Sequence, residues 1–178
     1  MNDITILEEI QKLLQKNVAD HIKLQKANDK DIFNYELVSP QIHIGWIPPK
    51  GFLPEGLDEG IPCIIIGHDE GNDDGRTADI NIRLSFVVFS PGKHDTKDID
   101  ELKNYTPNFE GYRDLLNLME KTKQEILRNQ IINKAFVIQY PIKWGMYQEQ
   151  PYPYWYGWIT FSIRKQAYPP AAIAEKYL

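Results

Sequence analysis

The chain has 178 residues and a formal net charge of -5, with 42% hydrophobic and 25% charged residues. This composition is typical of one globular domain, and its acidic balance argues against a dedicated nucleic-acid-binding module, which carries a basic surface. The single cysteine, Cys63, excludes an intrachain disulfide, and its apolar surroundings predict a buried side chain.

The first residues, MNDITILEEIQ, lack the apolar core of a signal peptide, and no run is long and apolar enough to predict a membrane helix. We therefore expect a protein that is made and folded in a cytoplasm and has no membrane partner.

The N-terminal part of the chain predicts one helix and two strands. Residues 3–16 form an expected helix with Asp3 as its N-cap. Its apolar stripe comprises Ile4, Leu7, Ile10, Leu13 and Leu14. Alternation at residues 33–37 indicates an exposed strand, and residues 42–47, IHIGWI, predict another that ends at a proline pair. Residues 61–67, IPCIIIG, are continuously apolar, which favours a strand buried on both faces.

Residues 78–90, ADINIRLSFVVFS, carry the strongest strand pattern, and the rest of the chain is expected to build onto them. Every second side chain is apolar: Ile80, Ile82, Leu84, Phe86 and Val88. A strand that is dry on one face needs a covering layer. Residues 68–77, HDEGNDDGRT, predict a turn or flexible loop, so residues 61–90 are expected to form an antiparallel hairpin with an extended tip.

The C-terminal part predicts a second helix and a closing hairpin. Residues 111–128 have helical periodicity and are expected to cover the long strand. Residues 135–140 and 155–165 predict strands, joined by a connection rich in aromatic residues and proline at 144–154. The chain is thus expected to be one α+β domain, residues 1–178, with an antiparallel sheet of hairpins, two main helices on one face, and a peripheral tail at 166–178.

The sequence lacks the common catalytic and phosphate-binding motifs. It has no nucleophile elbow and no glycine-rich phosphate loop, so we expect neither catalytic residues nor a cofactor. A calcium-loop pattern that starts at Glu70 has Asn81 where the bidentate glutamate belongs, which favours a solvated turn without a metal. His43 and His68 meet if their strands pair. This leaves open a small ligand-binding module or hydrolase with a pocket near these histidines and Trp46.

A segment near the C-terminus has more large aromatic side chains than the core is expected to bury. Large rings stand at Tyr147, Tyr152, Tyr154, Trp155, Tyr156 and Trp158. Strand alternation turns Tyr154, Tyr156 and Trp158 away from the face of Trp155. Tyrosine and tryptophan are enriched where subunits meet, so Tyr152, Tyr154, Tyr156 and Trp158 are candidate interface residues. The alternative is that a second layer of the same chain covers them.

In this layout the chain resembles the phage tail terminator, or tail-completion, proteins. The resemblance lies in the helix LEEIQKLL, the hairpin from IPCIIIG to ADINIRLSFVVFS, the helix GYRDLLNLMEKTKQEILR and the closing hairpin that ends in GWITFSIRKQ. It implies a virion protein with a structural, non-enzymatic role that caps the tail tube as a hexameric ring. The implied partners are further copies of the chain, the tail-tube protein and the head connector protein.

The acidic segment fits this role as a lumen or partner loop. Its candidate residues are Asp69, Glu70, Asp73, Asp74 and Arg76. Negative charge around the lumen would let DNA, present only as passing cargo, slide without sticking. Another head–tail connector or a tail-tube component is a further alternative.

Overall fold

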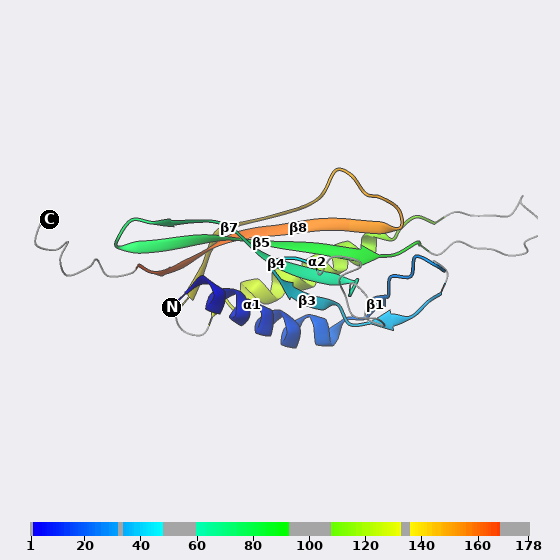
Figure 1. The fold of residues 1–178 in the computed structure, drawn as a ribbon, viewed down its shortest axis with the longest axis horizontal. Helices are drawn as coiled ribbons and strands as arrows, with labels where there is room; N and C mark the ends of the chain where they lie inside the picture. The colour runs from blue at the N-terminus through cyan, green and yellow to red at the C-terminus, as the bar shows by residue number, and fades with distance from the viewer. Residues whose placement is uncertain (1, 32–33, 48–59, 93–107, 133–135, 168–178) are drawn as a thin grey trace, which may run out of the picture.

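A computed structural model describes residues 2–31, 34–47, 60–92, 108–132 and 136–167. The fold is α+β, as expected: two helices lie on one face of a mostly antiparallel, strongly curled sheet (Figure 1). A short helix η1 (Ala19–His21) and a small sheet of β1 (Leu24–Gln25) and β2 (Leu37–Val38) complete the described fold. Within these ranges, no helix is long and apolar enough to cross a membrane.

The main sheet has six strands in the order β3-β4-β5-β8-β7-β6. The strands are β3 (Gln41–Ile44), β4 (Cys63–Asp73), β5 (Thr77–Phe89), β8 (Tyr154–Gln166), β7 (Phe136–Met146) and β6 (Ile131–Ile132). All neighbouring pairs are antiparallel except β3 and β4, which run parallel. The chain between Ile44 and Cys63 is long enough to return to the same end of the sheet, as a parallel pair requires.

Strand β5 lies at the centre of the sheet and confirms the alternation in the sequence. Its inward side chains, from Ile80 through Val88, are each at most 2% exposed. The same face of β4 and β8 is also buried, through Ile64, Ile66, Ile159, Phe161 and Ile163. These side chains and the two main helices form one core.

Helix α1 (Asp3–Asn17) occupies the predicted residues, but its N-cap lies one residue before the predicted Asp3. Asn2 is its N-cap, because its side-chain oxygen accepts a hydrogen bond from the backbone N–H of Thr5 at 3.0 Å. The buried residues are Ile6, Leu7, Ile10 and Leu14. Ile4, expected in the buried stripe, is 61% exposed, because the face centred on Ile6, Ile10 and Leu14 turns it outward.

Helix α2 (Tyr112–Arg128) covers the sheet beneath β5 and β8, as predicted. Its buried residues include Leu115, Leu118, Met119, Thr122 and Ile126. Tyr112 and Leu116 lie at the exposed margin of this face.

The expected loop at residues 68–77 is wrong for most of its length. Strand β4 continues to Asp73 and β5 begins at Thr77, so only Asp74 through Arg76 form the turn. Cross-strand pairs with β5 hold these polar residues in the ladder, with a bulge between His68 and Glu70. The result is a solvated β4–β5 arm, in which β5 pairs with β4 on one side and with β8 on the other, and its tip projects beyond the end of α1 (Figure 1).

The closing hairpin is also longer than predicted. Strand β7 passes through Pro141, with irregular pairing to β8 between Gln139 and Lys143, and ends at Met146. Proline is tolerated there because the strand is bulged. Residues 144–146, expected in a connection, are therefore strand. Most of the expected tail, residues 168–178, lies outside the described residues, as does residue 33 of the exposed strand predicted at 33–37.

Candidate functional site

The candidate site is the outer face of the sheet, defined as the face turned away from α1 and α2. On β5 this face carries Asp79, Asn81 and Arg83, and on β8 it carries the residues that pair with them. Both helices lie on the opposite side, so no described helix covers this face (Figure 1). Its side chains are therefore available for contact with other molecules wherever the described chain leaves them exposed.

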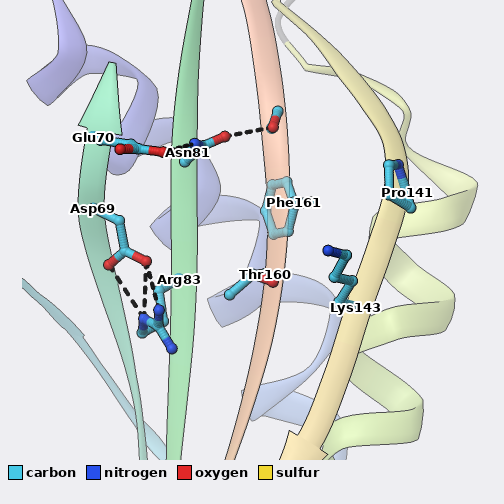
Figure 2. A pocket seen from close by; sticks show the side chains of 9 residues that line it. Asp69, Glu70, Asn81, Arg83, Pro141, Lys143, Thr160 and Phe161 are labelled. Carbon is cyan, nitrogen blue, oxygen red and sulfur yellow. Dashed lines mark hydrogen bonds and ion pairs between the residues drawn. The ribbon is translucent and has the colours of Figure 1, made fainter. Parts of the chain in front are cut away.

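A polar hollow of about 450 Å³ opens on this face (Figure 2). Strands β4, β5, β7 and β8 all contribute to it, through residues that include Asp69, Asn81, Arg83, Lys143, Thr160 and Ser162. Lys143 stands on β7, across the hollow from Asp69 and Arg83 (Figure 2). Basic, acidic and neutral polar groups thus share one surface.

An ion pair and a hydrogen-bonded chain order the hollow. Arg83 donates from Nε to Asp69 Oδ2 at 2.9 Å and from Nη2 to the same oxygen at 2.8 Å. The hydrogen bond that Arg83 donates to the Asp69 carboxylate raises the pKa of Arg83. Asn81 donates to Glu70 at 2.8 Å and accepts from Ser162, so three strands are tied together. Both side chains of the ion pair are partly exposed, so the pair contributes little to stability. Its main effect is to fix the orientation of the two side chains.

The candidate lumen residues fall into two groups. Asp69, Glu70 and Asp73 lie on β4, whereas Asp74 and Arg76 lie in the turn at the tip of the arm. Asp73 accepts from Gly75 N–H at 2.8 Å, and Asp74 accepts from the N–H groups of Thr77 at 2.7 Å and Arg76 at 2.8 Å. These backbone hydrogen bonds lower the pKa of Asp74. Both carboxylates therefore shape the tip, and Asp74 stays charged to lower pH than an ordinary aspartate.

The structure places the aromatic row partly in contact with its own chain. The ring of Tyr154 lies 5.3 Å from that of Phe89 and 6.5 Å from that of Tyr156, and its hydroxyl donates to Asp29. Trp158 packs beside Gly145 on the neighbouring strand. All three rings of the row on β8 remain half-buried.

Tyr152 precedes β8 and is 46% exposed. Its ring lies 5.6 Å from that of Phe109, and its hydroxyl donates to the backbone oxygen of Pro91 at 3.2 Å. Trp155 faces inward, as alternation predicts, and its indole N–H donates to the backbone oxygen of Ser90 at 2.8 Å. The four candidate interface residues thus combine contacts within the chain with exposed ring surface.

The structure does not bring His43 and His68 together. His43 lies on the outer face of β3, beside Ile65, and burial lowers its pKa. His68 pairs with the inward-facing Ile82 and points to the helix side, 3.9 Å from Asp3. Trp46 follows β3 and is 87% exposed. In the described part of the chain, no group of three or more histidine, cysteine or acidic side chains is placed to hold a metal.

A second exposed aromatic surface was missed by the sequence reasoning. On β7, Tyr140 is 65% exposed and Trp144 is 55% exposed, with Lys123 Nζ 4.1 Å above the Trp144 ring. Pro141 interrupts the apolar pattern, and Trp144 was assigned to a connection. Edge strands tolerate proline, so a strand predicted to continue through Pro141 would have included Trp144.

Comparison with known protein-family models and with curated proteins finds no significant match. Function must therefore be inferred from the residues and their arrangement.

Proposed function

We propose that this chain is a structural virion protein that caps the phage tail tube as a ring and joins the tail to the head connector. The observation that carries the proposal is the outer face, which no described helix covers and which bears the half-buried rings of Tyr154, Tyr156 and Trp158. The inner face already supplies a complete core, so folding alone does not require these rings. Rings of this kind are enriched where subunits meet.

The order of elements supports the same role. An N-terminal helix, a long hairpin, a second helix and a closing hairpin follow one another, as in the tail terminator proteins that the sequence resembles. A ring requires a contact between unlike surfaces that closes by rotation. A curled sheet with a different surface at each margin meets that requirement.

The acidic arm supports a lumen position. The β4–β5 arm carries Asp69, Glu70, Asp73 and Asp74, and only Asp69 forms an ion pair with a basic side chain in the described residues, at Arg83. An excess of carboxylates repels a phosphate backbone, so DNA that passes along such a surface is not retained.

The experiment that tests the proposal measures tail length. A phage or prophage lacking only this chain is induced, and its particles are imaged by electron microscopy. Without a cap we expect tail tubes of unregulated length without heads, and normal joined tails when the chain is supplied from a plasmid. Tails of normal length with heads attached in the deletion strain would contradict the proposal.

A further inference from the structure

We propose that copies of this chain join through the two open margins of the sheet, the β4 margin of one copy pairing with the β7 margin of the next. The inference rests on the proposed ring and names the contact that builds it. The β4 margin is defined as residues 67–73 and the β7 margin as residues 142–146.

Among the described residues, the β4 margin is an open edge of the sheet. Strand β3 pairs with β4 only along Cys63–Ile66, and no described strand pairs with residues 67–73 on the side away from β5. The N–H of Asp74 donates to the carbonyl of Thr77. Because bonded and non-bonded pairs alternate in an antiparallel ladder, Gly71 and Asp73 turn their backbone groups outward.

The β7 margin is likewise an open edge within the part of the chain that the structure describes. Strand β6 pairs with β7 only at Phe136 and Val137, so no described strand covers residues 142–146 on the side away from β8. The N–H of Tyr147 donates to the carbonyl of Tyr156. The same alternation turns the backbone groups of Trp144 and Met146 outward. A free strand edge beside an exposed tryptophan is an aggregation hazard unless a specific partner covers it.

Strand direction makes a second copy the fitting partner. Strands β4, β5, β8 and β7 alternate in direction, so β7 runs opposite to β4. A neighbouring copy in the same orientation therefore places its β7 antiparallel to this β4. That is the pairing that already holds most of the sheet.

Charge favours the same match. The β4 margin contains Asp69, Glu70 and Asp73 and no lysine or arginine. The β7 margin contains Lys143 and no acidic residue. Because the two margins are unlike, the contact is head-to-tail and closes into a ring when the rotation per copy divides the circle.

Two substitutions remove one outward N–H each while leaving the internal ladder bonds in place. Gly71→Pro deletes the outward donor of the β4 margin, and Trp144→Pro deletes that of the β7 margin. Gly71→Ala is the matched control, because a Cβ at this position meets its nearest atom at an ordinary contact distance of 3.5 Å. Trp144→Ala controls for the loss of the ring. Circular dichroism and thermal unfolding establish that each variant is folded.

Sedimentation velocity over a concentration series that extends into the millimolar range gives the readout. We expect the wild-type chain and Gly71→Ala to associate, and each proline variant to associate at least about tenfold more weakly than its alanine control. An equal mixture of the two proline variants should form dimers and nothing larger, since one intact margin of each kind remains. A wild-type chain that stays monomeric, proline and alanine variants that associate equally, or a mixture without dimers would overturn the inference.

Failure of the contact is distinguishable from failure of the proposed function. If Gly71→Pro restores normal tail length in the deletion strain, the margin contact is wrong while the capping role stands. If wild-type copies associate through these margins but do not regulate tail length, the capping role is wrong while the contact stands.

Discussion

At the scale of single residues, Gly111 shows how closely α2 approaches the sheet. A Cβ at this position would lie 2.4 Å from the backbone oxygen of Ser90 and 2.5 Å from Nε1 of Trp155. These are the two atoms of the hydrogen bond that fixes Trp155. Glycine is thus required there by space and not by backbone conformation.

Gly111→Ala is expected to lower the free energy of unfolding by about 1–3 kcal/mol, the usual cost of overpacking a core contact. Gly67→Ala is the control, because its nearest atom is 3.5 Å away, and it should be nearly neutral. Urea denaturation followed by tryptophan fluorescence measures both. Equal stability of the two variants would show that the approach at Gly111 is looser than described.

Because of Cys63, the free energy of unfolding is expected to decrease as the pH rises into the alkaline range. Burial raises the pKa of its thiol from 9.0 to about 12, so the folded state holds the proton over a range in which the unfolded state releases it. The stability linked to this proton is complete below pH 9 and is lost progressively as pH rises toward 12. The loss is at most about 1.4 kcal/mol per pH unit.

The measurement is urea denaturation of the wild type and Cys63→Ala at pH 8 and pH 10. The alanine variant lacks this titration, so the difference in unfolding free energy between the two proteins should shrink as pH rises. A difference that is the same at both pH values would show that the thiol of the folded protein ionises normally.

At the scale of elements, the turn at the tip of the β4–β5 arm has both a structural and a charge role. Asp73→Asn combined with Asp74→Asn keeps side-chain oxygens that accept the turn hydrogen bonds but removes their charge, so the melting temperature should fall less than in Asp74→Ala. Asp74→Ala removes the acceptor for the N–H groups of Arg76 and Thr77 and should lower it. Because these bonds lower the pKa of Asp74, its stabilising effect should be present at neutral pH and fade as pH falls through that lowered value.

The same double variant tests the lumen position. Loss of two negative charges should slow DNA release from assembled particles, measured by the rate of ejection in vitro. A matched double variant on the helices, Glu8→Gln with Glu120→Gln, removes equal charge far from the arm and should leave the rate unchanged. Ejection at the wild-type rate in both variants would count against a lumen position for the arm.

Elements with strong periodicity were predictable from the sequence, and elements held by partners distant in sequence were not. Alternation over residues 80–88 gave the inward face of β5, and helical spacing placed α2 close to its true bounds. Residues 68–77 were predicted as a loop because their glycines and aspartates favour a turn locally. In the structure, pairing with β5 holds most of them in a strand.

The candidate site was predicted in part. Alternation identified Tyr154, Tyr156 and Trp158 as facing away from Trp155. Their neighbours were not predictable, because Tyr154 meets Asp29 from 125 residues away in the sequence. The alternative that His43 and His68 meet is wrong although β3 and β4 pair, because the pairing turns the two side chains to opposite faces of the sheet.

At the scale of the whole molecule, the pairing of β5 with β8 joins the two hairpins into one sheet. This long antiparallel contact runs from Thr77 to Phe89 and leaves the helices on one side and the polar hollow and aromatic row on the other. One face therefore builds the core, and no described helix covers the other, which we propose makes the contacts of assembly together with the sheet margins. The proposed capping role depends on that division.

Imaging the assembled tail tests this role most directly. Tails purified with a labelled copy of this chain, examined by electron cryo-microscopy, should show one ring of the chain at the head-proximal end of the tube, with the β4–β5 arms facing the lumen. Label distributed along the tube, at the opposite end, or missing from the particle would contradict the account.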